Sequence, residues 1–228
     1  MSSKQIVLLV ALSIALGLMA LGALIHFSGR PVGPSQGGEL VFSDDFDREE
    51  VGPNYRAAAA DYGYKAGRWV IENGRLKAEK IHNAALWLKR ELPQNIRVEF
   101  DAKAHSNDGD VKCEIFGDGR THQSGYILIH GGWKNSTVCI ARQDEHGEDR
   151  KVDNRDCSVR GGRRQCVESD VDYHWAVERM GSTLKWYLNG RLIMTYPDGS
   201  PVQGSHFAFN NWEAPVSFDN LKIYLLSD

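Results

Sequence analysis

The sequence predicts an all-β domain of two packed antiparallel sheets, preceded by one N-terminal transmembrane helix. Three observations lead to this prediction: an uncharged apolar run near the N-terminus, many short strand-like segments separated by Gly, Asn and Asp turns, and no long amphipathic helical pattern among those segments. The 228 residues are enough for one large β domain. The formal net charge of −3 gives no reason to expect nucleic acid as a partner.

The apolar run extends from Ile6 to Ile25, and Ser13 is its only polar residue. A helix of this length, at about 1.5 Å per residue, spans the roughly 30 Å hydrocarbon core of a bilayer. Lys4 precedes the run and Arg30 is the first charge after it, which favours a cytoplasmic N-terminus. A cleaved signal peptide is the alternative, although such signals usually have a shorter apolar region of about 7–15 residues. In both cases the rest of the chain is exported. The length of the apolar run favours the uncleaved anchor, so we expect a single-pass membrane protein with an extracytoplasmic domain, either periplasmic or extracellular.

The expected boundaries are a signal-anchor segment at 1–29, a Pro- and Gly-rich linker at 30–38 and the β domain at 39–228. Asn73-Gly74 and Asn189-Gly190 predict two-residue hairpin turns. After an opening strand, the predicted strands are Arg68–Glu72, Arg75–Glu79, Ala84–Lys89, Ile96–Lys103, Val111–Phe116, Gly125–His130, Thr137–Arg142, Tyr173–Met180, Thr183–Leu188, Arg191–Tyr196, His206–Asn210 and Val216–Leu225.

Alternation of apolar and polar residues indicates which face of a strand is buried. Ile96–Lys103 alternates in this way, and its polar residues, expected to face solvent, are Arg97, Glu99, Asp101 and Lys103. Trp175 and Trp186 lie in consecutive predicted strands and are expected to form an aromatic cluster across them.

All four cysteines lie in the exported part, where disulfides are expected. Cys157 and Cys166 enclose eight residues, which predicts a tight stapled loop. Cys113 and Cys139 lie in predicted strands and could pair if those strands are neighbours. Four cysteines allow three pairings, and spacing alone does not choose between them.

Four segments carry a family resemblance: Glu39–Phe46 at the start of the domain, Trp69–Leu76 as a W-x-x-x-x-G-x-L hairpin, Trp186–Gly190 as a W-x-x-N/D-G turn, and Val216–Tyr224 as a closing strand. In these segments the chain resembles the concanavalin A-like lectin/glucanase superfamily, and within it the 3-keto-disaccharide hydrolase-like and laminarinase-like domains. The resemblance implies a jelly-roll sandwich. It is informative about fold rather than activity, because its motifs are turns and core positions.

A catalytic set is difficult to find. Retaining glycoside hydrolases need two carboxyl groups about 5–5.5 Å apart, and the family 16 enzymes of this superfamily carry Glu-x-Asp-x-Glu on one face of a strand. Glu99 and Asp101 begin such a pattern, but Lys103 stands at its third position; Glu114 begins another that fails at its second and third positions. We therefore expect Glu99 and Asp101 to form a solvated face with Arg97 and Lys103, and Asp110 to be a turn residue.

Two polar segments each contain a Trp that is hard to explain as part of the core, namely Trp133 and Trp212. Sugars stack their apolar C–H patches on aromatic rings and bind polar groups through their hydroxyls, so these segments predict a glycan site. The predicted ligand-binding residues are Trp133, Trp212, Asn211, His130, Arg142 and Glu145. The alternative is that the Trp side chains fold over a sheet edge and that the charged residues form a solvated loop.

Two further sites are predicted. Arg160, Arg163 and Arg164 lie in the loop between Cys157 and Cys166, and their guanidinium groups suit a sulfate, phosphate or carboxylate on an anionic ligand. Many members of the superfamily bind a structural calcium between the first and last strands. The resemblance implies the same possibility here at Asp44, Asp45 and Asp219, although turn and capping bonds explain these aspartates equally well.

The sequence therefore predicts a membrane-anchored, extracytoplasmic carbohydrate-binding module that has glycans as partners and requires no cofactor. One alternative is a glycoside hydrolase with a non-standard carboxylate pair. The other is a structural or assembly protein of the cell envelope.

Overall fold

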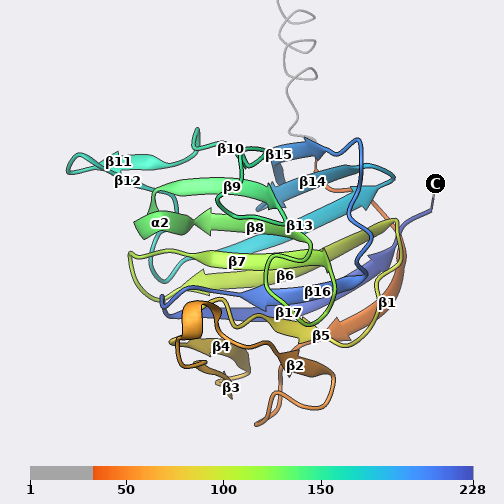
Figure 1. Cartoon of the computed structure of the whole chain (residues 1–228), viewed down its shortest axis with the longest axis horizontal. Coiled ribbons are helices and arrows are strands. Elements are labelled where there is room, and N and C mark those ends of the chain that lie inside the picture. The colour runs from red at the N-terminus through yellow and green to blue at the C-terminus, as the bar shows by residue number, and fades with distance from the viewer. Residues whose placement is uncertain (1–32, 228) are drawn as a thin grey trace, which may run out of the picture. The chain divides into compact units, whose positions relative to one another are not determined.

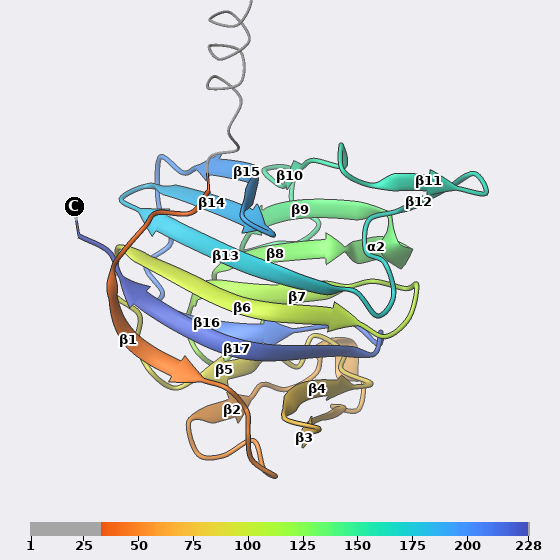
Figure 2. The ribbon, with the colours of Figure 1, turned by 180° about the vertical axis from the view of Figure 1, so that it is seen from behind.

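The computed structural model describes residues 33–227, which form two antiparallel β-sheets packed face to face (Figures 1 and 2). The first sheet contains, in spatial order, β15 (Arg191–Pro197), β14 (Thr183–Leu188), β13 (Asp172–Met180), β6 (Ile96–Ala104), β17 (Val216–Leu225), β4 (Arg75–Glu79) and β3 (Arg68–Glu72), and β1 (Glu39–Asp44) also pairs with β17. The second contains β10 (Lys151–Val152), β9 (Thr137–Arg142), β8 (Tyr126–Gly131), β7 (Val111–Gly117), β16 (His206–Asn210), β5 (Leu86–Leu88) and β2 (Tyr55–Ala57). The predicted all-β, two-sheet architecture is confirmed.

Four short elements lie outside the two sheets. The strands β11 (Ser158–Arg160) and β12 (Arg163–Gln165) form a separate hairpin. The single turns η1 (Asp61–Gly63) and α2 (Gly132–Asn135) lie in loops. The sequence predicted none of these as regular structure.

Both Asn-Gly hairpins are confirmed. Asn73 and Gly74 have φ angles of 54° and 68°, and the flanking residues Glu72 and Arg75 are paired. Such a turn requires a left-handed backbone at both positions, because only then does its twist match that of the two strands. Asn and Gly adopt this conformation at the lowest cost.

The core lies between the two sheets. In β6 the apolar residues are buried, as the alternation predicted. The Trp175 and Trp186 ring centroids lie 4.5 Å apart on neighbouring strands, which confirms the predicted aromatic cluster. Phe100 packs on Trp175 at 5.2 Å and joins these rings to the centre of the core.

In the part of the chain that the structure describes, no helix is long and apolar enough to cross a membrane. The predicted anchor at 1–29 lies outside the described residues and stays a prediction. The described end of the linker is bound to the first sheet, because Arg97 donates hydrogen bonds to the carbonyls of Ser35 (2.5 Å) and Gly37 (2.9 Å).

Candidate functional site

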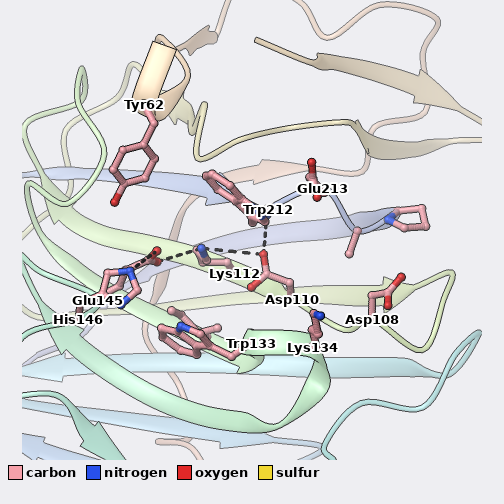
Figure 3. A pocket seen from close by; sticks show the side chains of 13 residues that line it. Tyr62, Asp108, Asp110, Lys112, Trp133, Lys134, Glu145, His146, Trp212 and Glu213 are labelled. Atoms are coloured by element: carbon pink, nitrogen blue, oxygen red, sulfur yellow. Dashed lines mark hydrogen bonds and ion pairs between the residues drawn. The ribbon is translucent and has the colours of Figure 1, made fainter. Parts of the chain in front are cut away.

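A cavity of about 530 Å³ lies over the outer face of the second sheet (Figure 3). Strand β7 and the residue before it supply its floor, while α2, η1, the chain that follows β16 and the loop after β9 supply its walls. The aromatic residues that line it are Tyr62, Trp133 and Trp212. The ionisable residues that line it are Asp108, Asp110, Lys112, Lys134, Glu145, His146 and Glu213. The volume is that of an ordinary small-ligand pocket.

The floor is built by the alternation of β7. Val111 and Cys113 face the core between the sheets, so Lys112 and its neighbours at every second position face outward. The Lys112 Nζ donates to Asn83 Oδ1 at 2.8 Å and to Glu145 Oε2 at 3.0 Å, and it lies 3.9 Å from Asp110 Oδ2. One buried ammonium group therefore links two carboxylates at the bottom of the cavity.

The two carboxylates have opposite pKa shifts. Burial raises the pKa of Asp110, and the attraction of Lys112 offsets only part of that effect. Burial also acts to raise the pKa of Glu145, but Lys112 and His122 together reverse it, so that this pKa is lowered. The pKa of Lys112 is raised, because the attraction of Asp110 and Glu145 exceeds the effect of burial. Environments that separate the pKa values of two carboxyl groups are typical of functional sites.

Glu114, one of the weak catalytic candidates, lies on the same face but is fully buried behind the cavity. Its Oε1 accepts hydrogen bonds from His122 Nδ1 (2.6 Å) and Asn210 Nδ2 (2.7 Å), and its Oε2 accepts one from the Gln123 backbone (3.0 Å). His122 Nε2 in turn lies 3.8 Å from Glu145 Oε2. Glu114 is thus a buried, fully hydrogen-bonded side chain that supports the floor.

Trp212 forms one wall within a group of rings. Its ring centroid lies 5.1 Å from that of His82, 5.5 Å from that of Tyr64 and 6.2 Å from that of Tyr62. The Trp212 backbone N–H donates to Asp110 Oδ2 at 2.5 Å, which fixes this wall to the floor.

Trp133 forms the opposite wall (Figure 3). It is 39% exposed, which is unusual for so large an apolar side chain. The Arg150 guanidinium carbon lies 4.6 Å from its ring centroid, and the His146 ring lies 5.6 Å away, edge to face.

The structure brings together three of the six predicted ligand-binding residues: Trp133, Trp212 and Glu145 all line the cavity. Asn211 is buried beneath it and donates to the Asp110 carbonyl at 2.9 Å, so it supports the floor without lining it. Asp110 itself was predicted only as a turn residue, and Lys112 was not predicted at all. Their alternation with Glu114 along one strand is the signal that would have found them.

The other two predicted ligand-binding residues lie elsewhere. His130 faces the core, where its ring centroid lies 5.0 Å from that of Tyr173, because it has the same parity along β8 as the inward-facing Leu128. Arg142 lies at the far end of β9 and pairs with Asp198 at 3.0 Å. Neither lines the cavity.

The remaining catalytic candidates lie on the opposite sheet. Glu99 pairs with Arg97 at 2.6 Å, as expected. Arg97 is only 6% exposed, so the prediction that it faces solvent was wrong, because the chain before β1 lies over it and accepts its hydrogen bonds. Asp101 pairs with His174 at 2.8 Å, whereas Lys103 pairs with Asp172. The predicted partnership of Lys103 within its own strand was therefore wrong, because the neighbouring strand β13 supplies nearer partners.

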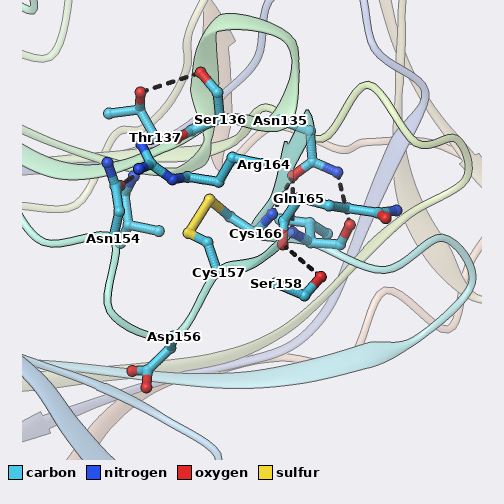
Figure 4. Close-up of a disulfide and its surroundings, with 12 residues drawn as sticks. Asn135, Ser136, Thr137, Asn154, Asp156, Cys157, Ser158, Arg164, Gln165 and Cys166 are labelled. Atoms are coloured by element: carbon cyan, nitrogen blue, oxygen red, sulfur yellow. Dashed lines mark hydrogen bonds between the residues drawn. A yellow bond between two sulfur atoms is a disulfide. The ribbon is translucent and has the colours of Figure 1, made fainter. Parts of the chain in front are cut away.

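Of the two possible disulfides, one forms. Cys157 and Cys166 are bonded, which confirms the stapled loop (Figure 4). Cys113 and Cys139 are free and buried, so their suggested pairing was wrong. Their strands are separated by β8, and the two side chains face opposite sides of the sheet.

Arg160, Arg163 and Arg164 lie on the β11–β12 hairpin and are exposed. Arg160 pairs with Glu168 at 2.7 Å, which offsets part of the local positive charge. An anionic ligand at this hairpin stays a prediction.

The aspartates of the calcium prediction lie near the contact of β1 with β17. Asp44 is already bound by Arg48 (2.5 Å) and by the Tyr55 hydroxyl (2.7 Å), and Asp219 lies 3.4 Å from Arg75. A guanidinium group competes with calcium for the same oxygens. Residues 33–227 contain no group of three or more His, Cys, Asp or Glu side chains arranged to hold a metal ion. Calcium at this position stays a prediction.

Searches of protein-family models and of curated proteins find no match to this chain. Solved structures are similar to it. SCLam, a non-specific endo-β-1,3(4)-glucanase from family GH16, has a TM-score of 0.58 and 14% identity over 86% of this chain and 94% of its own. The carbohydrate-binding module CBM66 from Bacillus subtilis has a TM-score of 0.57 and 16% identity over 77% of this chain and 98% of its own.

The Bacillus licheniformis β-glucanase has a TM-score of 0.54 and 13% identity over 85% of this chain and 100% of its own. At these identities the likeness shows the fold alone. The described residues have the concanavalin A-like jelly-roll fold that the sequence motifs predicted, the same fold as the family 16 glucanases and the carbohydrate-binding module.

Proposed function

We propose that the chain is a glycan-binding module, anchored to a membrane by its N-terminal segment and placed outside the cytoplasm, and that the cavity over the second sheet is its binding site. The observation that supports the proposal best is the cavity itself, in which Trp133 and Trp212 form facing walls above a charged floor. Rings in the walls suit the C–H faces of a sugar, and carboxylates in the floor suit its hydroxyls.

The charges around the cavity favour a neutral glycan. Lys112 donates to Glu145 and Asn83, and its charge is also balanced by Asp110, so little of that charge is left for a ligand. The cavity lining as a whole contains four acidic side chains and two lysines. A ligand that carries carboxylate or sulfate groups would meet net repulsion there.

The test is binding of the purified full-length chain, in detergent, to an array of neutral and acidic glycans. We expect neutral oligosaccharides to bind, and Trp133→Ala and Trp212→Ala each to weaken that binding. Tyr224→Ala is the control, because this half-exposed ring lies on the other sheet, where it contacts Arg97. The absence of any glycan ligand, or equal effects of all three substitutions, would contradict the proposal.

A glycoside hydrolase is the second candidate, and it is favoured by the opposite pKa shifts of Asp110 and Glu145. A raised pKa suits a general acid, and a lowered one suits a carboxylate nucleophile. Release of reducing ends from neutral polysaccharides tests this candidate. Activity that disappears in both Asp110→Asn and Glu145→Gln would establish it in place of simple binding.

A further inference from the structure

We propose that Asn135 is the positioning residue of this site. It would hold Trp133 in the wall of the cavity, and the Cys157–Cys166 disulfide would fix the segment to which Asn135 is bound. The inference rests on the proposed function, and it assigns a role in ligand affinity to a residue and a disulfide that do not touch the ligand.

The backbone that carries Trp133 has an unfavourable conformation. Trp133, Lys134 and Asn135 are three consecutive residues with left-handed φ angles of 50°, 57° and 61°. Asn tolerates this conformation, but for Trp and Lys it brings Cβ too close to the backbone. Such a turn persists only where surrounding contacts hold it, and strained turns of this kind occur at functional sites.

The Asn135 side chain supplies those contacts. It is 2% exposed, and its Nδ2 donates to the carbonyls of Val167 (2.7 Å) and Asn107 (3.0 Å). Its Oδ1 accepts from the backbone N–H groups of Val167 (2.8 Å) and Cys166 (3.0 Å). These four bonds use the full capacity of an amide side chain.

Two glycines leave room for this amide. A Cβ added to Gly131 would lie 2.6 Å from Asn135 Oδ1, and one added to Gly109 would lie 2.9 Å from the same atom. Real Cβ atoms do not approach an oxygen so closely, so the backbone is shaped around the Asn135 side chain.

The disulfide connects Cys166, in the segment that binds the Asn135 side chain, to the second sheet (Figure 4). Cys166 binds Asn135, and its bonded partner Cys157 donates its backbone N–H to the Asn154 carbonyl at 3.1 Å. The Asn154 side chain accepts from the backbone of Val138, in strand β9, at 2.7 Å. The segment that holds Asn135 is thereby tied to the second sheet, although the hairpin between the two cysteines is exposed.

A wall fixed in this way increases affinity, because the ligand does not have to order Trp133 when it binds. If Asn135 acts on the ligand only through Trp133, the changes in ligand affinity caused by substituting the two residues will not be additive.

The experiment is a double-mutant cycle with Asn135→Ala and Trp133→Ala, measured by the affinity of the full-length chain for the best neutral glycan of the array. We expect each single substitution to weaken binding by about tenfold, the scale of one well-placed aromatic contact. We expect Asn135→Ala to cause no further loss in the Trp133→Ala background. Losses that multiply, or unchanged affinity in Asn135→Ala, would overturn the proposal.

Asn135→Gly serves as the matched variant, since glycine keeps the left-handed backbone but removes the amide. The proposal expects it to weaken binding as Asn135→Ala does; wild-type affinity in Asn135→Gly would show that only the backbone conformation matters. If Asn135→Ala does not fold, the variant with both Cys157→Ser and Cys166→Ser keeps Asn135, and the proposal expects reduced affinity there too. Wild-type affinity in that variant would remove the disulfide from the proposal.

A spectroscopic readout separates this inference from the proposed function. The contribution of Trp133 to the near-ultraviolet circular dichroism is the difference between the spectra of the wild type and of Trp133→Phe. We expect the same difference, measured between Asn135→Ala and the double variant Asn135→Ala/Trp133→Phe, to be absent whether or not any glycan binds. If no glycan binds, the proposed function fails while this readout still tests the positioning. If the Trp133 contribution in the Asn135→Ala background equals that in the wild type, the positioning role is overturned.

Discussion

The stability of the domain should depend on His130 below neutral pH. This residue is 4% exposed and is packed against Tyr173, Trp175 and Trp186, so burial lowers its pKa from 6.5 to about 4. In the unfolded chain His130 takes up a proton near pH 6.5, whereas in the folded chain it does so only near pH 4. Between these values the unfolded state binds more protons, so the free energy of unfolding falls as the pH falls. Linkage gives a loss of about 2.5 kcal/mol between pH 7.5 and 4.5 from this one group.

The assay is urea unfolding at several pH values between 7.5 and 4.5 for the wild type and for His130→Phe and His130→Gln. Each substitution also changes the packing, which shifts the free energy of unfolding by the same amount at every pH. The quantity to compare is therefore the slope of the free energy of unfolding against pH. Both variants should lose less stability than the wild type over this range. His174 is the control, because its hydrogen bond with Asp101 raises its pKa. Its contribution is present at low pH and is lost as the pH rises, so His174→Gln should change the slope in the opposite direction. Parallel profiles for the wild type and both His130 variants would refute the reasoning.

Three further predictions concern the floor, the cysteines and a turn. Lys112→Met leaves two buried carboxylates without their partner and should lower the free energy of unfolding by about 3–5 kcal/mol in urea titrations; a loss below 1 kcal/mol would mean that water reaches the floor. Cys113 and Cys139 are free and buried, so a thiol reagent should find none in the native chain and two after unfolding without reductant; any other number contradicts the disulfide assignment. Gly74 has a φ of 68°, so Gly74→Ala should cost about 1 kcal/mol in the same titrations, and no cost would argue against the turn.

The fold could be predicted because its signals are local. An Asn-Gly pair fixes the twist of its own hairpin, and the alternation in Ile96–Ala104 records which face of that strand is buried. Both signals depend on a few consecutive residues, so no knowledge of the remaining chain is needed to use them. Strand order is different: whether Cys113 and Cys139 are neighbours depends on which strand lies between theirs, and consecutive residues do not record that.

The residues of the candidate site were predicted only in part, for a related reason. Trp133 and Trp212 could be identified because each stands out within its own polar segment. His130 was misplaced because its strand is apolar on both faces, which hides the alternation that would have shown it pointing inward. Lys112 was missed because its partners Asn83 and Glu145 lie 29 and 33 residues away along the chain and meet it only in the folded state.

Lys112 also bears on the choice between binding and cleavage. A carboxylate that attacks a sugar carbon becomes an ester and loses its charge. If Glu145 did so, the buried Lys112 ammonium, which lies 3.0 Å from it, would lose its nearest counter-charge and keep only the more distant Asp110, 3.9 Å away, and Glu114. A buried charge with a weakened partner is costly, so the same ion pair that lowers the pKa of Glu145 opposes its conversion to an ester. A hydrogen bond from a sugar hydroxyl to Glu145 carries no such cost, because the carboxylate stays ionised, and this asymmetry favours a site that holds glycans over one that cleaves them.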